Sequence, residues 1–327
     1  MTEVSVIIPA WRAGGTIARA LASVAAQTVP PLEAIVVDDG SDDDTFAAAE
    51  ACRPAMGAIG LVVVRQDNAG AGAARNRALA LARGTFVAFL DADDAWMPEK
   101  LERSLEKFAA DPGLDFVSHD VLAVDEHGTE TIRDTVRHFH GDPFVALFKR
   151  GFVGTSTVVA RRAAVLAAGG FEPGLRAAQD HDLWLRLAAR GRFLTFRGAL
   201  MRYYPTPAGI TGNVARRRAC ELAVMQRNAH ALEGRGPVLP VLWTRALIVQ
   251  YEAFAAWRGR GNPVRAAFEL LRTPWVVAAA TTLAGGERMT RLAILAWMTA
   301  VIGAYYATNA PYYAEKLGAF GRFLFGG

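Results

Sequence analysis

Cysteine is almost absent from this 327-residue sequence, which contains only Cys52 and Cys220. Two cysteines so far apart match no metal-binding or redox motif and no disulfide framework, so we expect free thiols in a reducing compartment. The sequence opens on the apolar run 4–8 without a basic segment and a cleavage site before it, so we expect no secretory signal. We therefore expect the catalytic part in the cytoplasm.

Lysine is scarce too, although lysine and arginine together number 36. The lysines are Lys100, Lys107, Lys149 and Lys316. None stands in a P-loop sequence, and Gly70-Ala71-Gly72 lacks the final glycine of a dinucleotide fingerprint, which argues against both kinds of site. The tight basic run 216–218 predicts a solvated helix face, and no basic stripe carries interleaved aromatics, so no nucleic-acid partner is expected. The excess of arginine suits phosphate groups or an anionic membrane surface.

Uninterrupted apolar segments long enough for a membrane helix are missing as well. The uncharged stretch 273–286 is too short, and 292–314 is interrupted by Asn309 and Pro311. Both belong to a region after residue 212 for which we expect helices. Two interpretations stay open for them: a helical hairpin or self-association contact, and a contact with the membrane surface beside Arg288 and Arg291, peripheral at the inner face.

The first 110 residues contain a regular alternation of short β-branched runs and helical patterns. The expected strands are 4–8, 34–37, 61–64 and 85–90, and the expected helices are 16–27, 45–51, 71–82 and 99–108. This alternation predicts an α/β fold whose mostly parallel sheet has helices on both faces. A polar segment follows each expected strand, and ligands bind at this carboxyl edge of such sheets.

The pattern changes after residue 115. It predicts a strand with a hairpin near Gly128 and, after the segment 152–159, a helix that ends at Gly169-Gly170. The segment 179–187 begins polar and becomes amphipathic, so we expect a helix there with its acidic residues near the N-terminus.

The stretch Asp91-Ala92-Asp93-Asp94 carries three carboxylates directly after an apolar run. Carboxylates this close raise one another's pKa or bind a cation, and hard oxygen ligands at a sheet edge suit Mg²⁺ or Mn²⁺ that bridges to phosphate. The structural alternative is that Asp93 or Asp94 caps the helix that opens near Pro98. The stretch alone leaves both interpretations open.

With these motifs placed in order, the first 211 residues resemble the family 2 glycosyltransferases, which have the GT-A fold. The resembling segments are 4–11, 23–28, 36–41 with Thr45, Asn68 with Gly70, 74–76, 91–94, 169–172 and 180–184. Each motif alone is weak, but the ordered set is specific, and it favours the metal interpretation of the acidic stretch.

The resemblance implies a domain organisation. We expect a Rossmann-like GT-A catalytic domain over residues 1–212, with a nucleotide-sugar half up to about residue 112 and an acceptor half over 113–212. A helical C-terminal region, 213–327, follows it.

The resemblance also implies roles for single residues on the donor side. The residues that would bind the nucleotide sugar are Pro9, Ala10, Trp11, Asp38, Asp39, Asn68, Arg75, Asp91 and Ala92. Asp39 would accept a hydrogen bond from the base; an Asx turn to Gly40 is the structural alternative, and Asp38 and Asp39 can divide the two roles. Asp93 would ligate Mg²⁺ or Mn²⁺ directly, and Asp91 would contact ribose or metal-bound water.

On the acceptor side the resemblance implies that Asp180 is the catalytic base. Asp182 is the second candidate, with a helix cap as its structural alternative. The residues that would contact the acceptor are Gly154, Thr155, Gln179, His181, Asp182 and Trp184.

The sequence departs from the family pattern in two places. Gln179 replaces the usual acidic residue before the base, and Thr206 stands where the family often has a histidine, which leaves a third metal ligand unassigned. The Gln-x-x-Arg-Trp motif of processive synthases is not found, which favours a single transfer per acceptor.

The expected function is that of an inverting, non-processive glycosyltransferase of the hexosyltransferase class, with a place in cell-envelope polysaccharide biosynthesis. It would move a sugar from a nucleoside-diphosphate sugar, UDP-linked in our expectation, to a saccharide or lipid-linked acceptor with a divalent metal. Two alternatives are a sugar nucleotidyltransferase and a noncatalytic nucleotide-sugar-binding or scaffold protein.

Overall fold

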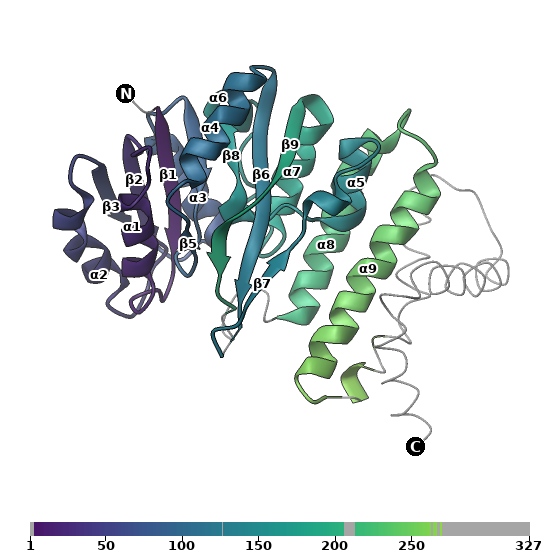
Figure 1. Cartoon of the computed structure of the whole chain (residues 1–327). Helices are drawn as coiled ribbons and strands as arrows, with labels where there is room; N and C mark the ends of the chain where they lie inside the picture. Colours follow the sequence, from purple (N-terminus) through teal and green to yellow (C-terminus); the bar gives the residue numbers. More distant parts are fainter. Residues whose placement is uncertain (1–2, 126, 206–212, 263, 267–268, 270–327) are drawn as a thin grey trace.

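The computed structural model describes the chain apart from residues 1–2, 126, 206–212, 263, 267–268 and 270–327. Among the described residues, nine strands form one sheet in the order β3-β2-β1-β4-β8-β6-β9-β5, with β7 paired to β6. Figure 1 shows the sheet running from β3 on the left to β9, with helices α5, α8 and α9 on the right.

The N-terminal part of the sheet is parallel. It consists of β1 (Val4–Ala10), β2 (Glu33–Asp38), β3 (Gly60–Arg65) and β4 (Phe86–Phe89). Helices α1 (Ile17–Ala25), α2 (Thr45–Ala51) and α3 (Ala71–Leu81) connect these strands, and a short helix η1 (Arg53–Met56) follows α2. Every residue of β1 and β2 is buried, which is why both were visible as continuous apolar runs. The predicted alternation is confirmed here.

The second part of the sheet is mixed. β6 (Leu114–Val124) and β9 (Arg192–Tyr203) are parallel to each other, whereas β8 (Val159–Arg161) is antiparallel to both β4 and β6. β5 (Ala95–Trp96) is antiparallel to β9, and α4 (Lys100–Ala110) follows it. The predicted hairpin is confirmed as the pair of β6 with β7 (Glu130–Arg133). The α/β fold was thus predicted correctly, but the parallel pairing is concentrated in the N-terminal part.

The segment 152–159 contributes little to the sheet. Residues Thr155–Thr157 form a short 3-10 helix, η3, and only Val159 belongs to β8. The Thr157 hydroxyl and backbone N–H both donate to the carbonyl oxygen of Gly154. Serine and threonine side chains offer the backbone such local hydrogen bonds in place of a sheet ladder.

Two hydrophobic clusters fill the two faces of the sheet. Alternate residues of β1 divide between them, because Ile7 belongs to one cluster and Val6 and Ile8 belong to the other. The first cluster contains a group of aromatic rings in which Trp184 lies 5.4 Å from Phe89 and 5.8 Å from Phe116 between ring centroids.

Helices that follow residue 135 cover the first cluster. They are α5 (Pro143–Arg150), α6 (Arg162–Ala167), α7 (Gln179–Arg190), α8 (Val214–Asn228) and α9 (Val238–Gly259), with the short helices η2 (Val136–His138) and η5 (Ala229–Leu232). Val224 of α8 and Leu242 of α9 are fully buried in that cluster. The expected helical region after residue 212 is confirmed for α8 and α9, and the domain boundary stays a prediction.

None of the helices in the described part of the chain has both the length and the apolar character needed to cross a membrane. The stretches 273–286 and 292–314 lie outside the described residues, as does Thr206.

Candidate active site

The loops after β1 and β2 are tied together by side chains. The backbone N–H of Arg12 donates to the Ser41 hydroxyl, that of Ala13 to the Thr45 hydroxyl at 2.7 Å, and that of Gly14 to Asp43. These three N–H groups, which follow the first strand, therefore already have partners within the protein.

Asp39 organises the loop after β3. Its Oδ1 accepts hydrogen bonds from the Ala69 N–H at 2.9 Å and from Gln66 at 2.7 Å, and its Oδ2 accepts one from the Gly70 N–H at 2.8 Å. The side chain of Asn68 donates to the Asp39 carbonyl oxygen. A carboxylate oxygen has two lone pairs, so Oδ2 of this 3% exposed residue retains the capacity to accept one further hydrogen bond.

Asp38 forms the turn to Gly40. The sequence had left open which of the two acidic residues, Asp38 or Asp39, has this role. Oδ1 of Asp38 accepts a hydrogen bond from the Ser41 N–H at 3.0 Å. Gly40 lies between them with φ 71, and a Cβ at this position would come within 2.8 Å of the Asn68 backbone nitrogen, so the turn requires glycine.

The residues at the end of β1 differ in exposure. Pro9 and Ala10 are buried within the strand, whereas 47% of Trp11 is exposed. The Arg12 guanidinium lies 4.7 Å from the centroid of the Trp11 ring. Trp11 thus offers an aromatic face at the carboxyl edge of the sheet, where a base can stack.

Asp91 is paired with an arginine of the preceding helix. Nη2 of Arg75, on α3, lies 2.6 Å from Asp91 Oδ1. Arg75 is only 3% exposed, and its guanidinium also lies 5.3 Å from the Phe171 ring. Besides the nucleotide-sugar contact that the resemblance implies for Arg75, the structure thus shows a contact of this residue with a neighbouring carboxylate.

Asp94 does not cap a helix. The N-cap of α4 is Glu99, because β5 separates the acidic stretch from that helix, so the capping interpretation is wrong. Asp94 Oδ2 instead accepts a hydrogen bond from the Ser156 hydroxyl at 2.6 Å. Burial raises the pKa of Asp94 well above its usual range, and the charges of Asp91 and Asp93 add to this.

Asp180 lies in the first turn of α7, as predicted. Its Oδ2 accepts a hydrogen bond from the Thr155 hydroxyl at 2.7 Å, and its Oδ1 accepts one from the His181 N–H at 2.8 Å. The residue is partly exposed, so its carboxylate can both be oriented by the protein and be reached from outside.

The turn η3 joins this carboxylate to the acidic stretch. Thr155 donates to Asp180, while the next residue, Ser156, donates to Asp94 and accepts from the Asp91 N–H at 3.0 Å. The beginning of α3 completes the connection, since a Cβ at Gly72 would lie 3.4 Å from the Gln179 side chain. Asp39, through Gly70, and Asp91, through Arg75, are attached to the same helix.

The acidic stretch offers oxygen ligands to a divalent cation. Among the described residues, no three His, Cys, Asp or Glu side chains are placed to hold a metal on their own. Mg²⁺, however, is usually held by one or two carboxylates and completes its octahedron with substrate phosphates and water. Asp91 and Asp93, both partly exposed at the carboxyl edge of β4, fit that mode of binding.

Asp182 has a different environment from Asp180. It is fully buried, its Oδ2 accepts from Arg186 at 2.9 Å, and its Oδ1 accepts from Arg227 and from Asn228 at 3.0 Å. Asp182 thus joins α7 to α8, and these contacts favour a structural function.

The remaining residues suggested for the acceptor are mostly inside the protein. Trp184 is fully buried in the aromatic group, which favours packing over substrate contact. His181 and Gln179 are 7% and 5% exposed. Gly154 accepts the hydrogen bonds that form η3.

Several polar residues beside the site were not predicted from the sequence. Ser156 was given no role, although a polar triplet inside an apolar segment was a visible signal. Arg19, on α1, donates to the Asp93 carbonyl oxygen at 2.6 Å and lies 3.8 Å from the centroid of the Tyr204 ring. Nothing in the sequence pattern distinguishes Arg19 from any other helical arginine.

Two cavities lie away from this edge. One, between α8 and α9, has a volume of about 20 Å³, which has room for about one water molecule. The other, of about 550 Å³, lies at the start of β9 and is lined by residues that include Phe144, Arg192 and Phe193. Because β6 and β9 both begin there, it is at the opposite edge of the sheet from the carboxylates.

Comparison with known proteins gives the family. Residues 5–220 match the model described as glycosyl transferase family 2. The succinoglycan biosynthesis protein ExoU of Rhizobium meliloti is 33% identical over 204 residues, which cover 58% of this chain and 58% of that protein. The putative teichuronic acid biosynthesis glycosyltransferase TuaG of Bacillus subtilis is 33% identical over 190 residues, which cover 58% of this chain and 73% of that protein. The chain thus matches little more than half the length of ExoU.

Solved structures share the fold. TarS of S. aureus in complex with UDP-GlcNAc superimposes with a TM-score of 0.63 at 19% identity, over 86% of this chain and 88% of that one. The mannosyltransferase PcManGT of Pyrobaculum calidifontis, in complex with GDP-Man and Mn²⁺, superimposes with a TM-score of 0.57 at 20% identity, over 99% of this chain and 87% of that one. The chain therefore belongs to glycosyl transferase family 2, and its sheet with the helices that follow is a GT-A-type fold.

Proposed function

We propose that the protein is an inverting, non-processive glycosyltransferase that transfers a sugar from a nucleoside-diphosphate sugar, UDP-linked in the first instance, to a saccharide or lipid-linked acceptor hydroxyl. The observation that carries this proposal is that η3 holds both the proposed base Asp180 and the acidic stretch through adjacent residues. The names of the relatives, which concern succinoglycan and teichuronic acid, support a place in cell-envelope polysaccharide biosynthesis.

Each residue has a task in this reaction. Asp39 and Trp11 receive the nucleoside, and Asp91 and Asp93 would hold Mg²⁺ or Mn²⁺, which when bound neutralises the leaving diphosphate. Asp180 takes the proton of the acceptor hydroxyl, and each of its oxygens keeps a lone pair for this purpose. Attack by that hydroxyl opposite the leaving group inverts the anomeric centre. Asp182 keeps a structural function.

The sugar nucleotidyltransferase alternative needs a phosphate-binding loop after the first strand. The N–H groups of Arg12, Ala13 and Gly14 already donate to Ser41, Thr45 and Asp43, so this loop has no free backbone donors at those three positions. The contacts therefore favour glycosyl transfer over this alternative.

The location of the protein in the cell is also part of the proposal. We propose a cytoplasmic enzyme that is peripheral at the inner face of the membrane or that self-associates through its C-terminal helices.

A release assay tests the proposal. Purified protein with Mn²⁺ is incubated with UDP-, GDP- and dTDP-sugars, and formation of nucleoside diphosphate is measured. We expect turnover of one donor, loss of that turnover in Asp180→Asn with UDP binding retained, and loss of the Mn²⁺-dependent part of donor binding in Asp93→Ala. The control is Glu106→Gln, an exposed carboxylate on α4 that should change none of these. Full turnover by Asp180→Asn would refute the base, and donor binding without release in the wild type would favour the scaffold alternative.

A further inference from the structure

Three ionisable side chains from three helices meet inside the protein, directly behind Asp180. His181 lies on α7, Glu221 on α8 and Arg245 on α9, and each is at most 7% exposed. His181 Nδ1 is 3.2 Å from Glu221 Oε2, and Arg245 Nη2 donates to the same oxygen. Arg245 Nη2 is also 3.3 Å from His181 Nδ1. We call these three residues the interhelix triad.

The imidazole of His181 is held at both nitrogens. Its Nε2 lies 3.3 Å from the carbonyl oxygen of Leu147 on α5, an acceptor, so Nε2 carries the proton. Its Nδ1 then accepts from Arg245 in the neutral ring or donates to Glu221 in the imidazolium. The ring is tethered to the C-terminal helices in both protonation states.

The charges of the interhelix triad compensate one another. Burial alone would raise the pKa of Glu221, but the charge of Arg245 and the hydrogen bond to His181 lower it well below its usual range. Glu221 therefore stays ionised opposite Arg245. Removing one member of a buried ion pair leaves the other charge without compensation, whereas replacing both with apolar groups is often tolerated.

The triad is one peptide unit away from Asp180. The His181 N–H donates to Asp180 Oδ1, and no side chain caps the start of α7. The residue before the helix, Ala178, has φ 55, a left-handed conformation that is uncommon for alanine. The first turn of α7 therefore depends on tertiary contacts for its position, and His181 is the buried residue of that turn that reaches α5, α8 and α9.

Arg245 also supports the segment that delivers Thr155. Gly151 ends α5 with φ 55, and a Cβ there would lie 3.2 Å from Arg245 Nη1. Three residues separate Gly151 from Thr155, whose hydroxyl donates to the other oxygen of Asp180. One guanidinium thus packs against both segments that orient this carboxylate.

We propose that Glu221 and Arg245 are positioning residues that hold Asp180 in place through His181, so that the C-terminal helices α8 and α9 are part of the catalytic apparatus. The inference rests on the proposed role of Asp180 as base. A displacement of about 1 Å at a reacting group can cost about a hundredfold in rate, so the tether acts on kcat.

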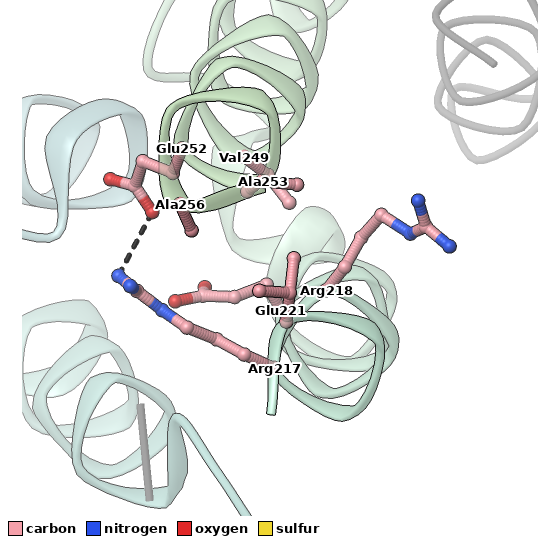
Figure 2. A pocket seen from close by; sticks show the side chains of 8 residues that line it. Arg217, Arg218, Glu221, Val249, Glu252, Ala253 and Ala256 are labelled. Atoms are coloured by element: carbon pink, nitrogen blue, oxygen red, sulfur yellow. Dashed lines mark hydrogen bonds and ion pairs between the residues drawn. The ribbon is translucent and has the colours of Figure 1, made fainter. Parts of the chain in front are cut away.

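The test uses the double variant Glu221→Leu/Arg245→Met, which removes both charges and keeps apolar bulk, and the single variant Glu221→Gln as a milder change. The matched control is Glu252→Gln. It removes the negative charge from the 2.9 Å ion pair of Arg217 with Glu252 (Figure 2), which joins the same two helices but is about one-third exposed. Folding is checked by thermal unfolding.

Two measurements are made. The first is hydrogen–deuterium exchange of the amides in the first turn of α7. The second is nucleoside diphosphate release from UDP-N-acetylglucosamine and GDP-mannose with Mn²⁺, analysed for kcat and donor KM. In the double variant we expect exchange at least tenfold faster and kcat at least tenfold lower, with donor KM within threefold of the wild type. Glu221→Gln should also show faster exchange and a lower kcat, but by smaller factors. Glu252→Gln should match the wild type in both measurements.

Wild-type exchange in a folded double variant would overturn the proposal, and so would an equal loss in Glu252→Gln. The hydrogen–deuterium exchange result tests the tether even if neither donor is turned over. A fully active Asp180→Asn would instead refute the base assignment, and accelerated exchange in the double variant would still show that the tether exists.

Discussion

At the scale of single residues, the proposed chemistry depends on the contact between Thr155 and Asp180. The hydroxyl of Thr155 fixes one oxygen of the carboxylate at 2.7 Å. A carboxylate that must take a proton from an acceptor has to stay in one orientation while the bond forms.

We expect Thr155→Val to lower kcat by about tenfold, because it removes a hydrogen bond to a charged group, a loss of about 1.5 kcal/mol. Thr155→Ser keeps the hydroxyl and should retain most of the activity. The measurement is nucleoside diphosphate release at saturating donor. Equal losses in both variants would contradict the expectation, because Thr155→Ser retains the hydroxyl that Thr155→Val removes.

His119 on β6 determines part of the response of stability to pH. Burial, and then the charge of Lys100, lower its pKa to about 3. The unfolded chain has a histidine pKa of about 6.5. The unfolded state therefore binds more protons than the folded state between these values, so this residue makes the protein less stable as the pH falls below about 6.5.

We expect the unfolding free energy of the wild type to fall more steeply than that of His119→Asn between pH 6.5 and 4, by up to about 1.4 kcal/mol per pH unit. Asparagine keeps a donor that can reach the Asp120 carbonyl oxygen, which the histidine contacts at 2.8 Å. Urea unfolding at several pH values measures the difference, and parallel curves for the two proteins would contradict the expectation.

At the scale of secondary-structure elements, Asn76 joins two segments of the site. Its side chain donates to the Phe171 carbonyl oxygen at 2.7 Å and accepts from the Phe171 N–H at 2.8 Å. Helix α3 is thereby fixed to the segment that leads into α7, and close packing at Gly170, with φ 66, keeps the two in contact.

We expect Asn76→Ala to lower the unfolding free energy by about 1–3 kcal/mol, because two buried backbone groups lose their partners. Arg77→Ala, an exposed neighbour on the same helix, is the control and should stay within about 0.5 kcal/mol of the wild type. Chemical unfolding compares the two. A loss in the control as large as in Asn76→Ala would assign the effect to helix α3 itself.

Element by element, the sequence predicted the N-terminal part of the chain best. Strands buried on both faces, such as β1 and β2, leave continuous apolar runs, and α1 between them buries Ile17, Leu21 and Val24 at helical spacing. The strands β5 and β8 have two and three residues, which is too short for any period to show. Their pairing is decided by contacts far along the chain.

The residues of the candidate site were also predicted only in part. Carboxylates that interrupt an apolar run were visible in the sequence, and Asp180 was placed correctly near a helix N-terminus. Ser156, Glu221 and Arg245 were not recognised, because their partners lie 24 to 65 residues away. The polar triplet around Ser156 was visible but did not reveal these partners, and Glu221 and Arg245 carry no local mark of their contact.

For the whole molecule, the proposed metal and the donor should stabilise the fold together. A ligand that binds only the folded state raises its stability by RT ln(1 + [L]/Kd), and a cation held by two carboxylates and a diphosphate needs both protein and nucleotide. We expect Mn²⁺ with UDP, GDP or dTDP to raise the melting temperature by more than the sum of the separate shifts.

This synergy should be restricted to the nucleotide of the true donor. It should disappear in Asp93→Ala and on addition of EDTA, and it should persist in Glu106→Gln. Differential scanning fluorimetry measures it without any need for the acceptor. Additive shifts in the wild type would argue that the cation and the nucleotide bind independently.

The turn η3 has a consequence for how enzymes of this design diversify. Because consecutive residues of one short turn hold Asp94 of the acidic stretch and the proposed base Asp180, an insertion or deletion in it would misalign both at once. Changes in sugar or acceptor preference should therefore accumulate in other loops, while the spacing between these two hydroxyl groups is inherited unchanged.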